Sequence, residues 1–334
     1  MGNNLYFSLS SSLLLLITTI NLLTLAHSKT YWEDIQVLKD LKNSLSPSSI
    51  IPGSCLSSWD FSVDPCDNAH TEKFTCGLRC DVVLSGSSRV TEITLDHAGY
   101  SGSLTSSSSW NLPYLETLDV SNNFLSNSVP DSLSNLTRLR RLSLSGNSFS
   151  GQIPSSIGSL YNIEELYLDH NEFEDRIPES FNGLTSLQRL EMQGNKLYGE
   201  FPNLGYVRNL YYLDVSDNFI SGEVPGLLPA FMSLLPKLSA LSMENNKFTG
   251  LIPTQYALKA VVPGSGISPF ERLLLGGNYL LGPIPGPLLG LKPGSVNVNL
   301  VDNCLYRCPE IFFFCQGGGQ KSLMECKSFT PVIP

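Results

Sequence analysis

Cysteine is missing from the long middle of this 334-residue chain, which has four cysteines before residue 81, four after residue 303 and none between. Charge is also sparse: charged residues make up 15% of the chain, and 30 acidic against 21 basic residues leave a net charge of −9. An acidic chain argues against binding to nucleic acid or to an anionic membrane and favours basic partners. The sequence also lacks the Gly-rich loop, His-Arg-Asp and Asp-Phe-Gly motifs of a kinase.

Long apolar runs are absent too, because no stretch reaches the roughly 18 residues that identify a candidate spanning helix. The run from Leu13 to Leu25 has the length of a signal-peptide core, and Ala26-His27-Ser28 supplies the small residues that a signal peptidase reads. We expect cleavage after Ser28, and an uncleaved anchor is the alternative. The mature chain is therefore expected to be secreted, with no membrane span.

The middle of the chain repeats one apolar frame that ends in asparagine, as in LETLDVSNN at 115–123 and IEELYLDHN at 163–171. Successive asparagines lie 24, 24, 24, 23, 28, 32 and 25 residues apart. This spacing is typical of a leucine-rich repeat. The asparagines at this position are Asn123, Asn147, Asn171, Asn195, Asn218, Asn246, Asn278 and Asn303.

The geometry of a β-strand explains which residue types this frame contains. Its two inner apolar residues, such as Leu118 and Val120, point to one side of a short strand, and their neighbours point to the other. Stacking the strands in parallel buries the apolar residues and leaves Asp119 or Tyr167 facing out. The asparagine amide can both donate to and accept from the backbone of adjoining turns, so we expect a structural ladder of asparagines. Ala98 takes the asparagine's place in the first copy of the frame, as suits a terminal turn.

A second motif follows most of the asparagines. An apolar residue is followed by Gly-x-Ile/Val-Pro, as in Phe149 to Pro154 and Phe248 to Pro253. Glycine allows a tight bend, and proline ends the extended piece because it cannot donate to a ladder. Runs such as 155–160 and 179–184 are then expected to form a turn of helix or 3₁₀ helix on the convex side.

This pair of motifs is similar to the repeats of plant extracellular leucine-rich repeat proteins, which include receptor-like kinases, receptor-like proteins and polygalacturonase-inhibiting proteins. The resemblance covers about residues 30–325. It implies an α/β leucine-rich repeat solenoid: a curved right-handed superhelix with a parallel β-sheet on its concave face, short helices or 3₁₀ turns on its convex side, and disulfide caps. Residues 73–80 replace the family's Trp-x-Gly-Val-x-Cys segment, which indicates a divergent branch.

The cysteines are placed where a solenoid needs caps, because its terminal turns expose hydrophobic edges. Cys-x-x-x-Cys spacings at 76–80 and 304–308 also occur in zinc sites, but a secretory leader favours disulfides. Each group of four allows three pairings, which the sequence leaves open. The cysteines expected to be disulfide-bonded are Cys55, Cys66, Cys76, Cys80, Cys304, Cys308, Cys315 and Cys326.

The expected organisation follows from these motifs. A helical face in the N-terminal cap is predicted from Asp34, Ile35, Val37, Leu38, Leu41 and Leu45. The predicted parts are a signal peptide at 1–28, an N-terminal cap with four cysteines at 29–88, about nine repeats at 89–303, and a C-terminal cap with four cysteines and a tail at 304–334.

The outward residues of successive strands form the concave face, where solenoids usually bind. Because parallel strands stack about 4.8 Å apart, the acidic residues among them would form a stripe. Arg140, Arg141, Arg189 and Arg272 interrupt this stripe and are placed to pair with it. The alternative is a polar face that is simply solvated. The candidate ligand-binding residues are Asp119, Tyr167, Asp169, His170, Glu191, Gln193, Tyr212, Asp214 and Glu244.

Two long spacings mark insertions near 226–236 and 257–269, which are either binding loops or tolerated surface extensions. Asn135 begins the sequence's N-glycosylation sequon and is expected on the convex side. Asp169 and Glu191 could be neighbouring carboxylates, but an open sheet cannot enclose a sugar ring or exclude water. We therefore expect no catalysis, no cofactor and no metal.

The expected function is recognition. The chain would be a secreted module that binds a protein or peptide ligand at the cell wall or cell surface, in signalling or defence, with a receptor-kinase ectodomain among its partners. The alternative, which the resemblance to polygalacturonase-inhibiting proteins implies, is direct inhibition of a secreted cell-wall-degrading enzyme.

Overall fold

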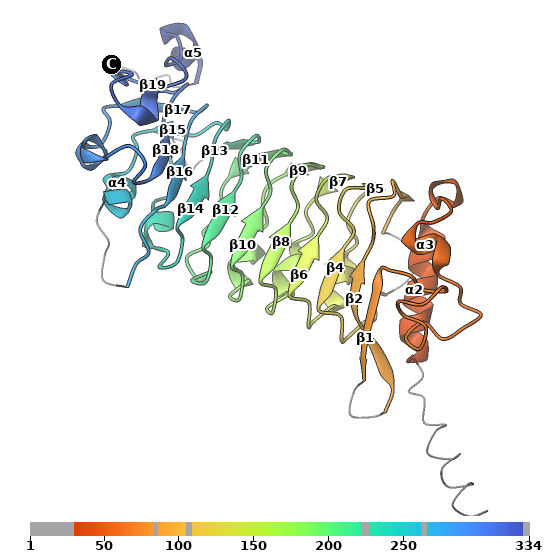
Figure 1. The fold of residues 1–334 in the computed structure, drawn as a ribbon. Helices are drawn as coiled ribbons and strands as arrows, with labels where there is room; N and C mark the ends of the chain where they lie inside the picture. The colour runs from red at the N-terminus through yellow and green to blue at the C-terminus, as the bar shows by residue number, and fades with distance from the viewer. Residues whose placement is uncertain (1–29, 83–85, 105–108, 222–226, 262–265, 330–334) are drawn as a thin grey trace, which may run out of the picture.

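The structure, a computed structural model, describes residues 30–82, 86–104, 109–221, 227–261 and 266–329. Figure 1 shows these residues stacked turn upon turn into an elongated, curved solenoid with one broad sheet along its length. Ten strands form that sheet, in the order β1 (Leu78–Val82), β2 (Ser88–Thr94), β4 (Thr117–Asp119), β6 (Arg141–Ser143), β8 (Glu165–Tyr167), β10 (Arg189–Glu191), β12 (Tyr212–Asp214), β14 (Ala240–Ser242), β16 (Arg272–Leu274) and β18 (Asn297–Asn299).

The sheet is parallel from β2 onward, as the repeat predicts. Its first pair differs from that expectation, because β1 runs antiparallel to β2. β1 belongs to the N-terminal cap and is joined to β2 by a short connection. An antiparallel pair needs only such a short connection, whereas a parallel pair needs a long crossover.

Extended pieces after the asparagines form two further sheets that run along one edge of the solenoid (Figure 1). The first has six strands in the order β13 (Phe219–Ser221), β11 (Lys196–Glu200), β9 (Glu172–Asp175), β7 (Ser148–Gln152), β5 (Phe124–Asn127) and β3 (Ser101–Gly102). The second has three strands, in the order β15 (Thr249–Gly250), β17 (Tyr279–Gly282) and β19 (Cys304–Leu305).

Short helices cover the side opposite the ten-stranded sheet, and most are 3₁₀ turns that begin directly after the repeat's proline. They are η2 (Asp131–Asn135), η3 (Ser155–Ser159), η4 (Glu179–Gly183), η5 (Ala230–Leu234) and η6 (Gly286–Gly290). The second insertion forms the α-helix α4 (Thr254–Val261), and η5 lies within the first. Residues 222–226 and 262–265, next to η5 and α4, lie outside the described residues.

The inner leucines of successive turns and the asparagines that follow them make a continuous core. Asn195 shows the pattern. Its Nδ2 donates to the carbonyls of Leu168 and Met192, both at 3.0 Å, and its Oδ1 accepts from the backbone N–H of Phe173 at 3.0 Å. Seven of the eight ladder asparagines are buried, and Asn147 is half-buried. Each one therefore joins its own turn to the preceding turn.

The N-terminal cap is the helix α2 (Trp32–Ser44), the turns η1 (Pro47–Ser49) and α3 (Cys55–Ser58), and strand β1. Disulfides join Cys55 to Cys76 and Cys66 to Cys80. The sequence counted Asp34 with the apolar face of the helix, and the structure gives it another role. Its carboxylate is 1% exposed and accepts two hydrogen bonds from the Arg89 guanidinium, at 2.8 and 3.0 Å.

The C-terminal cap covers the last turn with η7 (Phe313–Cys315) and α5 (Leu323–Phe329). Disulfides join Cys304 to Cys326 and Cys308 to Cys315, and the described residues contain no free cysteine. The backbone N–H of Leu300 donates to the carbonyl of Phe314 at 2.9 Å, which extends the solenoid's hydrogen bonding into the cap.

Within the described residues, no helix has the length and apolar character needed to cross a membrane. The expected signal peptide at 1–28 lies outside the described residues. The expected domain boundaries therefore stay predictions.

Candidate functional site

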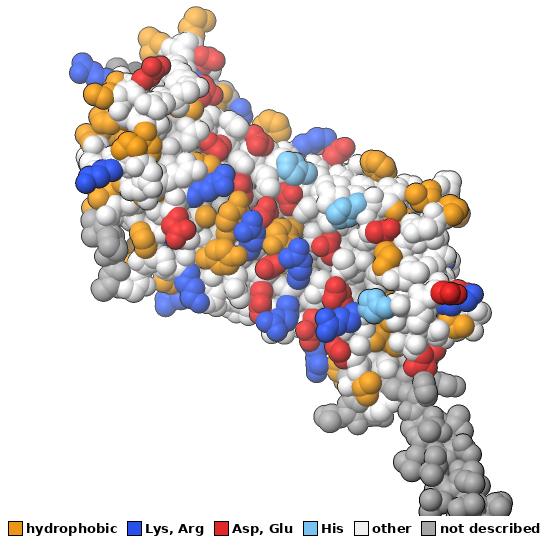
Figure 2. All heavy atoms as spheres, in the orientation of Figure 1, with side chains coloured by type: hydrophobic (Ala, Val, Ile, Leu, Met, Phe, Trp, Pro, Cys, Tyr) orange, Lys and Arg blue, Asp and Glu red, His pale blue; other side chains and the backbone are white. Residues whose placement is uncertain are grey.

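The exposed side of the ten-stranded sheet presents three outward residues per turn, and we call this surface the concave face. The pairing register aligns these residues into columns that run across the strands. The first column precedes the inner leucine of each turn, the middle column lies between the two inner apolar residues, and the last column follows them. In Figure 2, acidic and basic side chains are interspersed over the middle of this sheet.

Arg141 organises the N-terminal half of the concave face. Its guanidinium pairs with Glu165 of the next turn and lies 3.7 Å from Asp119 of the preceding turn. It also lies 4.7 Å from the centre of the Tyr167 ring, and the Tyr167 hydroxyl donates to Glu165 at 3.0 Å. Two carboxylates, one guanidinium and one aromatic ring therefore hold each other across three turns.

Arg189 repeats this arrangement further along. Its guanidinium pairs with Glu191 at 2.5 Å and lies 3.9 Å from the centre of the Tyr212 ring and 5.9 Å from that of Tyr167. The two tyrosines and the two arginines thus alternate across four strands. Together with Glu165, these residues form a half-exposed surface that is held rigid by cation–π and ionic contacts.

Three other carboxylates of the face have a different environment. Asp169, Asp214 and Glu244 form no ion pair with any described residue. Asp169 accepts from the Ser145 hydroxyl, Asp214 accepts from Ser216 at 2.6 Å, and Glu244 accepts from Asn299 at 2.6 Å. These three carboxylates are therefore held by neutral hydrogen-bond donors and not by a bonded cation.

Burial raises the pKa of two of these carboxylates. The pKa of Asp169 rises because its carboxyl is desolvated, against the Ser145 hydrogen bond, which lowers it. The pKa of Glu244 also rises by desolvation, against the opposing hydrogen bond from Asn299 and the positive charge of Arg272. Both groups are therefore easier to protonate than an exposed carboxylate.

Two buried atoms on this face have no hydrogen-bond partner among the described residues: Oε1 of Gln193 and Nε of Arg272. The Gln193 atom is an acceptor beside Glu191, to which its Nε2 donates at 3.2 Å. The Arg272 atom is a donor on β16, where Arg272 is paired in the register with Ala240 of β14. A bound ligand could satisfy both atoms.

The predicted site residues differ in how far their side chains are exposed. Asp119, Tyr167, Glu191, Gln193, Tyr212 and Glu244 lie half-buried on the concave face. Asp169 and Asp214 also belong to it but are only 8% and 7% exposed, so they form its floor and offer little contact area. His170 is exposed, but it belongs to the turn after β8, with a left-handed φ of 51° and its ring against Gly194.

The four arginines that were predicted to pair with the acidic stripe fall into two groups. Arg141 and Arg189 pair with the acidic stripe, whereas Arg140 pairs with Glu164, which precedes the strand, at 2.6 Å. Arg272 forms no ion pair with a described residue. The sequence reading missed Glu165 because it counted two outward residues per turn. The residue two places before Asp119 points to the same side of the strand as Asp119 does. Alternation along the strand could therefore have identified the first column.

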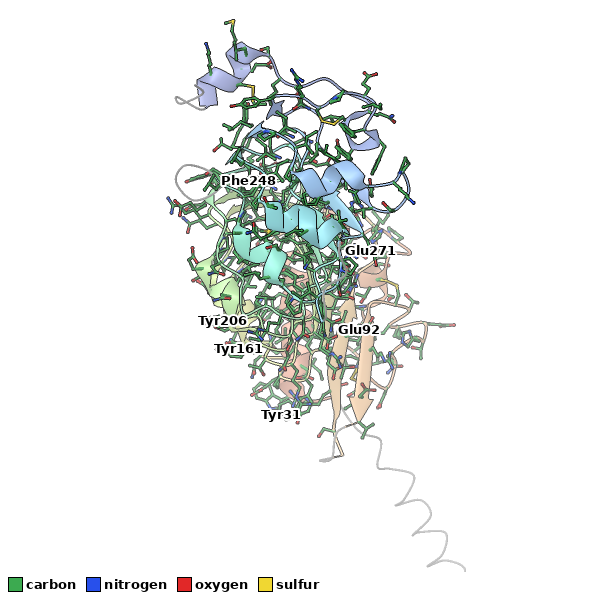
Figure 3. All side chains as sticks on the ribbon, turned by 90° about the vertical axis from the view of Figure 1, so that its left-hand side faces the viewer. Tyr31, Glu92, Tyr161, Tyr206, Phe248 and Glu271 are labelled. Atoms are coloured by element: carbon green, nitrogen blue, oxygen red, sulfur yellow. A yellow bond between two sulfur atoms is a disulfide. The ribbon has the colours of Figure 1, made fainter. Side chains whose placement is uncertain are left out.

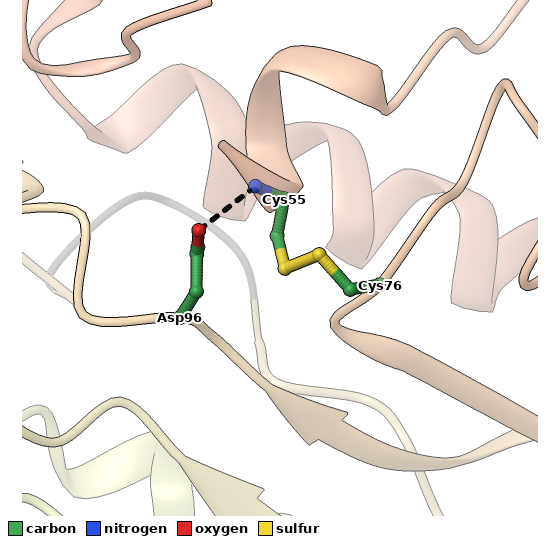
Figure 4. Close-up of side chains that lie close together, drawn as sticks. All are labelled: Cys55, Cys76 and Asp96. Atoms are coloured by element: carbon green, nitrogen blue, oxygen red, sulfur yellow. Dashed lines mark hydrogen bonds between the residues drawn. A yellow bond between two sulfur atoms is a disulfide. The ribbon is translucent and has the colours of Figure 1, made fainter. Parts of the chain in front are cut away.

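One cluster outside the concave face brings together the atoms of a possible metal site, at Cys55, Cys76 and Asp96 (Figure 4). Its two sulfurs are joined in a disulfide, so neither is a thiolate. The Asp96 carboxylate accepts from the backbone N–H of Cys55 at 3.2 Å and from the Tyr100 hydroxyl at 2.6 Å. The cluster therefore fastens α3 to the first repeat.

The leucine rich repeat family models match residues 88–149, 153–197 and 209–231. Receptor like protein 28 of Arabidopsis thaliana is 38% identical over 101 residues, which are 30% of this chain and 12% of that protein. The chain thus spans a small part of this curated relative.

Solved structures show the same fold. The ectodomain of the Arabidopsis receptor kinase HAESA, solved in complex with an IDA peptide hormone, superposes with a TM-score of 0.60 at 26% identity, covering 82% of this chain and 46% of that one. A plant ice-binding protein superposes with a TM-score of 0.61 at 21% identity, covering 87% of this chain and 91% of that one. The second likeness concerns the fold alone.

Proposed function

Because this chain belongs to the leucine-rich repeat family of plant extracellular proteins, we propose that it is a secreted recognition module whose concave face binds a protein or peptide ligand. It acts at the cell wall or cell surface, in signalling or defence. The HAESA ectodomain was solved with a peptide hormone, which supports a peptide as one class of ligand. Extracellular leucine-rich repeat ectodomains are not generally enzymes, in keeping with a binding role.

The observation that carries the proposal is the alternation of Arg141, Tyr167, Arg189 and Tyr212 across adjacent strands. Tyrosine and arginine are the residues most enriched among the energetic centres of protein interfaces. Here they are held in place before any ligand arrives, which lowers the entropy lost on binding. The open sheet offers a long, shallow surface of the kind that an extended polypeptide can cover.

The charge of the face favours a ligand with basic or hydrogen-bond-donating groups. Asp214 and Glu244 have no bonded cation among the described residues, and the chain as a whole carries a net charge of −9. A basic ligand would be attracted to this half of the face and would meet the paired half with its aromatic or polar groups.

A pair of double variants tests the concave face. Tyr167→Ala with Tyr212→Ala removes the two rings, and we expect binding of the natural ligand to weaken by about 30-fold or more, because central tyrosines contribute about 2 kcal/mol or more. The matched control is Tyr161→Ala with Tyr206→Ala. Those rings are 62% and 71% exposed, and Figure 3 shows them on the side away from Glu92 and Glu271. Equal loss from both pairs would contradict the proposal.

The alternative function is direct inhibition of a secreted cell-wall-degrading enzyme such as a polygalacturonase. The acidic concave face favours it, because a basic hydrolase would be attracted in the same way. Affinity capture from wall extracts with the full chain separates the two functions. Recovery of a receptor-kinase ectodomain that the tyrosine pair abolishes supports signalling, whereas recovery of a basic hydrolase whose activity falls on addition of the protein supports inhibition.

A further inference from the structure

A second surface, away from the concave face, has the form of a binding groove. It has a volume of about 700 Å³ and lies where strands β5, β7, β9 and β11 of the six-stranded sheet end and the 3₁₀ turns begin. Figure 1 shows these strands along the edge of the solenoid, beside the ten-stranded sheet. We call it the lateral groove. Its volume falls within the range of about 300–1,000 Å³ that ligand pockets occupy.

The floor of the lateral groove is apolar and repeats with the solenoid. Val129, Ile153 and Ile177 line it at intervals of 24 residues, and each is at most 4% exposed. Each is followed by the proline that ends the extended piece. Because neighbouring turns stack about 4.8 Å apart, the groove from the turn of Val129 to that of Glu200 spans about 14 Å. This length matches four to five residues of an extended peptide at about 3.3 Å each.

The rim of the lateral groove is acidic. Four carboxylates line it, at Asp131, Asp175, Glu179 and Glu200, against the single guanidinium of Arg176, so their combined charge is −3. Asp131 and Glu179 begin short helices, where an acid also suits the local backbone. Asp175 and Glu200 end strands instead, and the Asp175 carboxylate accepts from the backbone N–H of Arg176 at 2.9 Å and from the Gln152 amide.

Asp175 occupies a position that the fold otherwise gives mainly to glycine. Its φ is 70°, in the left-handed region, and the equivalent residues in other turns are Gly151, Gly199 and Gly250, with φ of 75°, 83° and 76°. An aspartate tolerates this conformation at a cost that glycine does not have. The groove therefore keeps a carboxylate at its centre at the expense of backbone strain.

We propose that the lateral groove binds an extended, basic peptide segment of a partner protein. The half-buried prolines beside the apolar floor, Pro154 and Pro178, would contact small aliphatic side chains, and the carboxylates of the rim would pair with the lysine or arginine side chains that alternate with them. The combination of an apolar floor with a net negative rim favours this occupant over an acidic or neutral polar one. The lateral groove and the concave face are separate surfaces, so the chain could hold two segments at once.

The test uses a fluorescent hexapeptide that alternates lysine and valine, with a glutamate–valine hexapeptide as the charge control. The full chain should raise the fluorescence anisotropy of the first peptide at 50 mM NaCl and not that of the second. Asp175→Gly with Glu200→Gln should weaken this binding by three- to ten-fold. Adding salt to 300 mM should weaken binding to the parent protein more than binding to this variant.

Asp175→Gly should leave the protein folded, because glycine adopts the required φ without strain. The melting temperature of this variant should stay near that of the parent. The matched control is Asn127→Gly, which makes the same backbone change at φ 69° at the equivalent position two turns earlier without removing a charge. It should bind the hexapeptide as the parent does.

Three results would overturn the proposal. They are no binding of the basic hexapeptide at 50 mM NaCl, unchanged binding by the groove variant, and equal weakening by Asn127→Gly. The Tyr167→Ala, Tyr212→Ala variant distinguishes binding at the lateral groove from binding at the concave face. If it alone abolished hexapeptide binding, the basic ligand would belong to the concave face, and the lateral groove would be excluded while the proposed function stood.

Discussion

At the scale of single residues, a short list of polar side chains holds the solenoid together. A strand of three residues forms few backbone hydrogen bonds, so each turn depends on the asparagine that follows its strand. The Asn195 amide satisfies carbonyls of two turns and one N–H of the earlier turn, all inside the core. Leaving such groups unpaired costs more than the hydrogen bonds gain, because a buried polar group retains its full desolvation penalty.

Asn195→Ala should therefore destabilise the fold strongly. It leaves the buried N–H of Phe173 without a partner, at a cost on the order of 1–3 kcal/mol, and it removes one of the two hydrogen bonds that the Leu168 carbonyl accepts, the other coming from Asn171. Thermal unfolding followed by circular dichroism should show a melting temperature several degrees lower. Asn297→Ala is the control, because Asn297 is exposed on β18. A variant of Asn195 that melted like the control would contradict the ladder's structural role.

The Asp169 carboxyl predicts a dependence of stability on pH. Burial raises its pKa in the folded state, so the folded chain holds this proton more tightly than the unfolded chain does. The stability that this contributes is complete below the unfolded pKa and is lost as pH rises through the raised folded pKa. Asp169→Asn, which keeps an acceptor for Ser145, should therefore raise the melting temperature more at pH 7 than at pH 3.5.

The control for this measurement is Asp81→Asn on the edge strand β1, which makes the same chemical change at an exposed carboxylate. A gain for Asp169→Asn that was the same at both pH values would mean that the buried carboxyl does not titrate differently in the two states. The same sign is expected for Glu244, whose pKa burial also raises.

At the scale of elements, the N-terminal cap is held by a buried ion pair as well as by its disulfides. Asp34 on α2 accepts from Nε and Nη2 of Arg89 and from the Val90 N–H at 2.9 Å. The Arg89 guanidinium lies 4.3 Å from the centre of the Tyr31 ring and 4.6 Å from that of Tyr114. Helix, strand and first repeat meet at this one guanidinium.

Asp34→Leu should loosen the cap. It leaves the Arg89 charge buried without its partner, and breaking a buried pair in this way costs about 3–5 kcal/mol. Adding Arg89→Met should recover much of the loss, because two apolar side chains can replace the pair. The exposed pair of Lys73 and Asp60 is the control, and Asp60→Ala should leave the melting temperature nearly unchanged. Failure of the double variant to recover would indicate that the Val90 N–H, which both variants leave without the Asp34 carboxylate, accounts for the loss.

The elements also show which features of the fold can be predicted from the sequence. The period predicts the strands, the 3₁₀ turns and the ladder, because each depends on residues within one turn. The disulfide pairing needed coordinates, since four cysteines in a cap satisfy every local rule in three ways. Asp34 was read as part of an apolar face because its partner, Arg89, lies 55 residues away. The lateral groove was missed because its lining residues come from four different turns.

On the concave face, too, the sequence predicts only part of what the structure shows. Alternation along a strand predicts which residues face outward, and the acidic residues among them are where the sequence places them. Alternation does not predict depth, and so Asp214 was expected as a contact although it is 7% exposed. Arginines from adjacent turns also neutralise part of the expected stripe.

At the scale of the whole molecule, the dominant feature is its negative field. A net charge of −9 acts on an approaching ligand from beyond contact distance, whereas the contacts of the concave tyrosines act only once the ligand is bound. Long-range attraction mainly raises the association rate, and salt weakens it because the screening length falls from about 10 Å at 0.1 M to shorter distances at higher ionic strength. Buried contacts mainly set the dissociation rate.

These two effects separate in a kinetic experiment with a captured basic ligand. Raising NaCl from 50 to 300 mM should lower the association rate constant by about ten-fold or more and change the dissociation rate constant little. Replacing Tyr167 and Tyr212 by alanine should do the reverse, raising the dissociation rate constant at both salt concentrations. Surface plasmon resonance with the full chain in solution measures both constants. A dissociation rate that followed the salt concentration would place the energy of the complex in exposed ion pairs, and the ordered tyrosine and arginine surface would then not be its centre.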